Sequence, residues 1–145
     1  MDTGLLIGRI ILVSIFVFSG TVKLLDVSGT ASHIAAKGLP APEILAIATG
    51  VFEVVCGTMV AVGWKTKHAA IALAIFTIVA AYFFHDFWNV APGSERIAQM
   101  LNAFKNFSMM GGLLFVGFAG AGRLSIDAHA GAAVRLYEGY EDKRT

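Results

Sequence analysis

The sequence predicts an all-α membrane protein in which four transmembrane helices form one bundle. Of its 145 residues, 57% are hydrophobic and only 14% are charged, whereas soluble domains usually carry about 25% charged residues. Four apolar stretches, separated by short polar connections, each approach the length needed to cross a hydrocarbon layer of about 30 Å. The net charge of +1 provides no basic surface for nucleic acid. Because the chain is so apolar, the lipid bilayer is the expected partner.

The first expected span is Gly4–Leu25, which is apolar except for Arg9 near its start and Lys23 near its end. Both long basic side chains can extend toward opposite membrane interfaces. The stretch is longer than the apolar part of a signal peptide and lacks an A-x-A-like cleavage site, which predicts a retained helix. A polar loop, Asp26–Pro42, follows it, and a short interfacial helix is expected near Ala31–Lys37.

The second expected span, Leu45–Val62, has a single ionisable group besides the Cys56 thiol, and this group is Glu53. Glu53 lies about ten residues, or about 15 Å, from the start of the helix, halfway through the hydrocarbon layer. A carboxylate at that depth is costly, so it should face protein, pair with a cation or be protonated. Small residues share its helical stripe and allow a neighbouring helix to approach closely: Ala46, Gly50 and Gly57. A structural role for Glu53 and a role in chemistry both remain open.

The third and fourth expected spans complete the bundle. A tight connection, Gly63–His68, leads into Ala69–Phe87, which ends in a belt of aromatic residues typical of a membrane interface. After a further loop, Ile97–Ala119 opens with polar residues and becomes purely apolar from Met109. Because the connections are short, successive helices should be antiparallel neighbours.

The distribution of lysine and arginine predicts that both termini are cytoplasmic. Residues 1–122 are expected to form the transmembrane domain, and residues 123–145 a polar cytoplasmic tail with a short surface helix at Ala128–Tyr137. Cytoplasmic segments of membrane proteins carry an excess of basic residues. This orientation places seven basic residues inside, namely Arg9, Lys65, Lys67, Arg123, Arg135, Lys143 and Arg144, and four outside, namely Lys23, Lys37, Arg96 and Lys105.

Polar groups gather in the outer half of the predicted bundle, whereas the inner half has almost none beyond Arg9. This asymmetry predicts a polar pocket that opens to the outer side and has Glu53 at its floor. Lys105 lies about 9 Å into its helix and is the first candidate partner for the acid, and Lys23 is the second. The other outer polar residues are His85, Asn102 and Asn106.

His85 has three interpretations: an interfacial side chain among aromatics, a proton-transferring group at the pocket mouth, or a metal ligand. The chain's four histidines fall on different segments without ligand spacing, so neither a metal nor a haem is expected. Asn102 and Asn106 are expected to form interhelical hydrogen bonds. Tyr82 and Trp88, from the aromatic belt, are candidates for the pocket lining. The single cysteine, Cys56, argues against a self-contained dithiol exchanger.

Several short motifs follow one another along the chain in a characteristic order. They are F-S-G-x-x-K-L from Phe18, G-L-P-A-P from Gly38, Glu53 followed by Gly57, H-D-F-W from His85, N-A-F-K-N-F from Asn102, and G-A-G-R-L-S-I-D from Gly120. This ordered set resembles the DoxX family of small bacterial membrane proteins and extends over roughly residues 4–127. The resemblance implies a multi-pass four-helix bundle in the bacterial inner membrane.

The family resemblance also implies a functional hypothesis, because related proteins are membrane subunits of sulfur-compound or thiol redox systems that deliver electrons to quinone. It implies a redox-linked subunit with an outward-opening pocket for a quinone or a small sulfur compound, and a membrane or redox partner protein that supplies the electrons. No intrinsic cofactor is implied. The alternative is a non-catalytic accessory or assembly subunit of a larger membrane complex, and both self-association and enzymatic activity are left open. The candidate catalytic residues are Glu53, Lys105 and His85, and the candidate pocket residues are Lys23, Asn102, Asn106, Tyr82 and Trp88.

Overall fold

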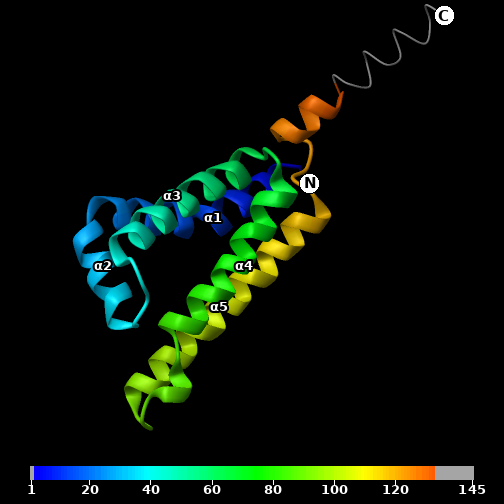
Figure 1. Ribbon diagram of the computed structural model, residues 1–145. Coiled ribbons are helices and arrows are strands. Elements are labelled where there is room, and N and C mark those ends of the chain that lie inside the picture. The colour runs from blue at the N-terminus through cyan, green and yellow to red at the C-terminus, as the bar shows by residue number, and fades with distance from the viewer. Residues whose placement is uncertain (1, 133–145) are drawn as a thin grey trace, which may run out of the picture.

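The computed structural model describes residues 2–132, and over this range the chain is helical and contains no strand (Figure 1). Three stretches are long and apolar enough to cross a membrane: Asp2–Leu25, Pro42–Val62 and Thr66–Asn89. The expected all-α membrane fold is therefore confirmed, while a fourth crossing stays a prediction. In chain order the elements are α1 (Asp2–Leu25), α2 (Val27–Ala36), α3 (Pro42–Val62), α4 (Thr66–Phe84), the 3-10 turn η1 (Phe87–Asn89) and α5 (Ser94–Ala119).

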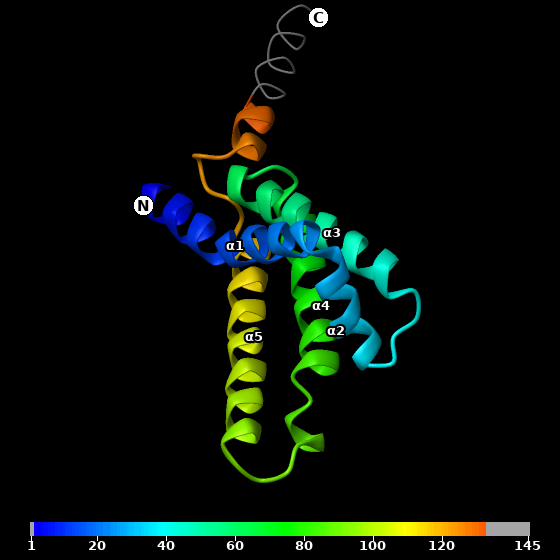
Figure 2. The same ribbon diagram turned by 90° about the vertical axis from the view of Figure 1, so that its left-hand side faces the viewer.

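The long helices are arranged as two antiparallel pairs, α1 with α3 and α4 with α5. The pairs meet at one end of the molecule, where the start of α1, the α3–α4 turn and the end of α5 come together (Figure 1). From there they diverge, and Figure 2 shows α1 crossing the direction of α4 and α5 steeply. The short helix α2 packs mainly against α3. The divergence of the two pairs leaves room between them for a cavity.

Local sequence signals explain where the observed helices differ from the expected ranges. The Asp26 carboxylate accepts a hydrogen bond from the Gly29 backbone N–H at 2.9 Å, so α2 begins at Val27, ahead of the expected Ala31. Helix α4 ends at Phe84 rather than Phe87, and a 3-10 turn carries the remaining aromatics. Helix α5 begins at Ser94, three residues before the expected start. The expected start was too late because the first turn of α5 is polar and lies outside the apolar periodicity.

Helices α1 and α3 approach closely because small residues line their contact. Ala46, Gly50, Glu53 and Gly57 are all buried on one face of α3, which confirms the expected stripe. A Cβ atom added at Gly20 of α1 would lie 2.6 Å from the Gly50 carbonyl oxygen, closer than real Cβ atoms come. The interface therefore requires glycine at Gly20, and this close approach positions the residues that follow on α1.

A hydrophobic core fills the end where the two pairs meet, and Arg9 is buried beside it with only 2% of its surface exposed. Its guanidinium donates hydrogen bonds to the carbonyl oxygens of Ala61, at 3.1 Å, and Leu124, at 2.9 Å, and also to that of Ala121. Arg9 is thus buried rather than extended away from the bundle as expected, because carbonyls in the last turn of α3 and after α5 lack intrahelical partners and need donors. The buried core residues are Val13, Phe16, Val60, Ala69, Ala70, Leu73, Ala74 and Leu113.

The segment after α5 returns to the same end and caps α4. The Asp127 carboxylate accepts hydrogen bonds from the backbone N–H groups of Lys65 and Thr66, at 2.8 and 2.9 Å, and from the Thr66 hydroxyl at 2.7 Å. Burial raises the pKa of Asp127, but these hydrogen bonds and the nearby Arg9 charge outweigh it and hold the pKa below its usual value. A helix covers residues 126–132; the rest of the expected Ala128–Tyr137 helix lies outside the described residues.

Candidate functional site

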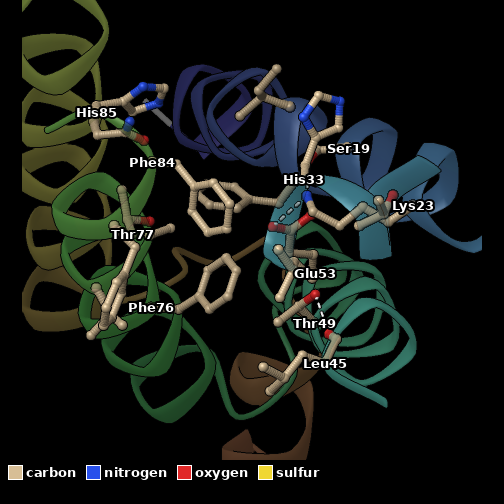
Figure 3. Close-up of a pocket in the computed structure, with 18 of the residues that line it drawn as sticks. Ser19, Lys23, His33, Leu45, Thr49, Glu53, Phe76, Thr77, Phe84 and His85 are labelled. Atoms are coloured by element: carbon tan, nitrogen blue, oxygen red, sulfur yellow. Dashed lines mark hydrogen bonds and ion pairs between the residues drawn. The ribbon is translucent and has the colours of Figure 1, made fainter. Parts of the chain in front are cut away.

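A cavity of about 540 Å³ lies between the two helix pairs (Figure 3). All five α-helices contribute to its wall, so it exists only in the folded arrangement. The polar side chains on its wall are Ser19, Lys23, Thr30, His33, Thr49, Glu53, Thr77, His85 and Asn106, and the remaining lining is apolar and aromatic.

An ion pair between Lys23 and Glu53 forms the most polar part of this wall. The Lys23 ammonium lies 3.0 Å from Oε1 and 2.9 Å from Oε2 of Glu53, and it also donates a hydrogen bond to the Ser19 hydroxyl. The Glu53 side chain is 5% exposed and that of Lys23 is 26% exposed. The carboxylate is thus paired with a cation, one of the three outcomes expected for an acid at this depth, and the lysine reaches toward more open space.

The lysine that pairs with Glu53 is Lys23, not the expected first candidate Lys105. Lys23 lies one helical turn beyond Gly20, where α1 and α3 are in closest contact, so its side chain passes directly over Glu53. Lys105 lies on an exposed face of α5, which packs against α4, and it does not line the cavity. Depth estimated along each helix could not reveal this, because it does not say which helices are neighbours.

The wall opposite the ion pair is mainly aromatic and comes from α4. Figure 3 shows the rings of Phe76 and Phe84 between the α4 backbone and the Lys23–Glu53 pair. The hydroxyls of Thr49 and Thr77 donate to carbonyls in their own helices, at 2.6 and 2.7 Å. Those hydroxyl protons are therefore already used, and the ion pair is the strongest hydrogen-bonding group that a molecule in the cavity would meet.

Two histidines lie on the cavity wall, one expected there and one not. His85 follows α4, and its Nδ1 atom lies 3.1 Å from Oε1 of Gln99 on α5, which fixes the orientation of the ring. His33 comes from α2 and lies on the same side of the cavity as Lys23 (Figure 3). His33 was not among the cavity residues expected from the sequence, although its spacing of three and one from Thr30 and Ile34 places all three on one helical face.

The other expected pocket residues divide into two groups. Asn106 lines the cavity, but its amide donates to the Asn102 carbonyl within α5, at 3.1 Å, rather than to another helix. Asn102 lies outside the cavity wall. Tyr82 and Trp88 border a separate apolar hollow between α4 and α5, because α4 turns this face away from α3.

Within residues 2–132, no group of three or more histidine, cysteine, aspartate or glutamate side chains is placed to hold a metal ion.

Fold and site together define a class of protein: a helical, multi-pass membrane protein with a lysine–glutamate pair on the wall of an internal cavity. The chain belongs to the DoxX family, whose profile matches residues 4–86. The matched region runs from α1 through α4 and includes Lys23, Glu53 and His85. The chain is therefore a DoxX-family integral membrane protein, as its ordered motifs indicated.

Curated relatives match most of the chain. Inner membrane protein YphA of Escherichia coli is 32% identical over 123 residues, which cover 85% of this chain and 87% of the relative. Inner membrane protein YqjF of the same organism is 30% identical over 129 residues, covering 87% and 91% respectively. The uncharacterized membrane protein Rv3486 of Mycobacterium tuberculosis is 37% identical over 95 residues, covering 62% and 58%. No solved structure shows a significant match.

Proposed function

We propose that this protein is a redox-linked membrane subunit whose cavity binds the ring of a quinone. The observation that carries the proposal is the Lys23–Glu53 pair, closed at 2.9 Å on the wall of an otherwise mainly apolar cavity. Ionisable groups inside membrane segments are costly and usually mark functional sites. A cavity of about 540 Å³ is within the size range of small-molecule sites.

The side chains around the pair suit both redox forms of a quinone. The Lys23 ammonium can donate to a quinone carbonyl, and the Glu53 carboxylate can accept from a quinol hydroxyl. The Phe76 and Phe84 rings provide flat apolar surfaces against which a planar ring can pack. The site therefore offers a donor, an acceptor and a ring-shaped space in one place.

Quinone reduction to quinol consumes two electrons and two protons. A partner oxidoreductase supplies the electrons in this proposal, and the Lys23–Glu53 pair exchanges protons with the two ring oxygens. His33 and His85 also line the cavity, and in this proposal their imidazole rings, which can each donate and accept a proton, pass protons between water and the ion pair.

The proposed topology has four crossings, with α5 as the fourth, and both termini in the cytoplasm of a bacterial inner membrane. Helix α5 has 26 residues, which at about 1.5 Å per residue is long enough to cross the bilayer despite its polar first turns. Its polar half lies at the same end as His85, which contacts Gln99, and this topology places that end on the outer side.

Binding of a short-chain ubiquinone to the purified protein in lipid nanodiscs tests the proposal. Saturable binding is expected, and Glu53→Gln or Lys23→Met should weaken it by roughly tenfold or more, as expected when a hydrogen bond to a charged group is lost. Lys67→Met, at the far end of α4, is the matched control and should bind like the parent.

Absence of saturable binding by the folded parent protein would overturn the quinone assignment. If the chain also co-purified with a large membrane complex, the accessory-subunit alternative would replace it. Equal binding by the parent and by Glu53→Gln would place the quinone elsewhere on the protein.

A further inference from the structure

A second ion pair joins the two helix pairs at the end opposite Arg9. Lys37 lies directly after α2, and its ammonium is 2.7 Å from Oδ1 of Asp86, which follows α4. The Asn89 side chain donates to the other oxygen of Asp86 at 3.2 Å and orients the carboxylate. The pair is partly exposed, with 33% and 25% of the two side chains accessible. It therefore lies at the surface, between segments that belong to different helix pairs.

Contacts between the helix pairs differ strongly along the length of α4. Near its start, Ala70 and Leu73 are fully buried in the core that all the long helices share. Midway, Phe76 contacts Phe52 of α3 with ring centroids 5.3 Å apart. At the far end of the cavity, Phe84 packs against a small separate cluster made by Ala31, Ile34 and Ala46. The two pairs are thus firmly joined at one end and lightly joined at the other.

Phe84 and the Lys37–Asp86 pair are neighbours at this lightly joined end. Phe84 and His85 line the cavity, and Asp86 is the next residue along the chain. On the other side, His33 and Ile34 of α2 line the cavity, and Lys37 follows one turn later. The ion pair therefore joins the segments that directly follow two cavity-lining helices, α2 and α4, and it lies at the surface.

We propose that the Lys37–Asp86 ion pair and Phe84 form a gate that controls access to the cavity from the outer end of the molecule. The gate deepens the proposed function, since it rests on the cavity being a ligand site, but its opening does not depend on which ligand binds. A partly exposed ion pair stabilises one arrangement only modestly. Such a contact can break and reform readily, as a gate must, and dissolved salt should weaken it.

The accessibility of a cysteine placed inside the cavity tests the gate. In a Cys56→Ala background, Thr77→Cys introduces a thiol at a cavity-wall position that is 2% exposed. The protein is reconstituted in lipid nanodiscs and labelled with a charged, membrane-impermeant methanethiosulfonate reagent. Asp86→Asn and Lys37→Met should each raise the labelling rate roughly fivefold, the scale of an exposed ion pair.

Two controls separate the gate from a general effect of charge. Glu95→Gln removes an exposed carboxylate in the first turn of α5 and should leave the labelling rate unchanged. Exchange of the charges, Lys37→Asp with Asp86→Lys, should restore slow labelling. High salt should accelerate labelling of the parent but not of Asp86→Asn. Ala80→Cys, also on the cavity wall, replaces the reporter if Thr77→Cys fails to fold.

Unchanged labelling in both Asp86→Asn and Lys37→Met would overturn the gate, as would equal acceleration in Glu95→Gln. The outcome is independent of quinone binding, because the labelling experiment contains no quinone. Accelerated labelling without quinone binding would support the gate and reject the proposed ligand. Quinone binding with unchanged labelling would support the ligand and reject the gate.

Discussion

Glu53 stays buried because Lys23 compensates its charge at hydrogen-bond distance. A carboxylate taken out of water loses several kcal/mol of hydration, and a close, well-oriented cation returns part of it. Lys23 keeps about a quarter of its side chain exposed, whereas the Glu53 side chain is almost fully buried. The two members of the pair therefore differ in exposure, and the lysine is the one nearer to open space. That asymmetry suits a pair whose lysine can turn toward a bound molecule.

Removing one member of this pair should destabilise the protein. We expect Glu53→Gln or Lys23→Met alone to cost about 3 kcal/mol, at the lower end for a buried pair because Lys23 is partly exposed. The double variant should recover much of the loss, since no unpaired charge remains. Lys105→Met should have little effect because that side chain is exposed on α5. Thermal unfolding of all four variants in the same detergent measures these changes in stability. A large loss of stability in Lys105→Met alone would contradict the observed pairing.

The α1–α3 pair is stabilised by close backbone approach rather than by large side chains. Gly20 contacts Gly50 across the interface, and Gly57 packs against Val17. In a membrane, lipid tails are as apolar as leucine, so helices associate through close packing and hydrogen bonds. The same contact positions Lys23 over Glu53, which links the stability of the helix pair to the geometry of the site.

Gly20→Ala should therefore separate α1 from α3 and lower stability by about 1–3 kcal/mol, the usual cost of overpacking. The added methyl group would lie 2.6 Å from the Gly50 carbonyl oxygen, and that backbone atom cannot yield without moving the helix. Gly8→Ala is the matched control on the same helix, because nothing lies within 4 Å of its added Cβ. Thermal unfolding of both variants tests this expectation. Equal stability of Gly20→Ala and Gly8→Ala would argue against the close contact.

The start of α4 depends on Asp127, which lies far along the chain but caps the helix. The folded-state pKa of Asp127 is lowered, so its contribution is present above the unfolded pKa of about 3.9 and is lost as pH falls through the folded pKa. We expect Asp127→Asn to lower stability by about 1 kcal/mol at pH 7. The difference in stability between the parent and Asp127→Asn should shrink below about pH 4, because the Asp127 carboxylate of the parent becomes protonated. Unfolding measured from pH 7 to pH 3 checks this, with Glu95→Gln as the control for loss of a negative charge.

At the scale of the whole molecule, the two helix pairs are joined at one end and separated at the other. Arg9 and Asp127 connect α1, the α3–α4 turn and the end of α5, while the cavity occupies the space between the diverging pairs. One end thus holds the two pairs together, and the proposed ligand site lies toward the other end.

The proposed topology, with four crossings and both termini in the cytoplasm, predicts a definite pattern of reporter activity. Fusions after Lys67 and Thr145 should report the cytoplasm, and fusions after Ala36 and Gly93 the external side, because basic residues favour this orientation. Phosphatase and fluorescent-protein fusions in a bacterial host measure both states. A tail on the external side would reverse the orientation and open the cavity to the cytoplasm.

The long helices, the position of Glu53 midway along its helix and the small-residue stripe beside it were predictable from the sequence. Each depends on local order along one helix: apolar length, distance from a helix start, and a period of 3.6 residues. The start of α2 was less predictable, because the side-chain cap of Asp26 extends the helix beyond its apolar face. The positions of Asn102 and Trp88 outside the cavity depend on how α4 and α5 rotate against each other.

The sequence by itself determined that this is a helical membrane protein with one acid deep in its second long helix. Only the tertiary structure decided that Lys23 rather than Lys105 neutralises that acid, that Arg9 is buried, and that His33 reaches the cavity. The physical reason is that burial and pairing depend on which helices are neighbours and at what angle they cross. Here a glycine contact between α1 and α3 positions Lys23 beside Glu53, while Lys105 lies on α5, which packs against α4 rather than α3.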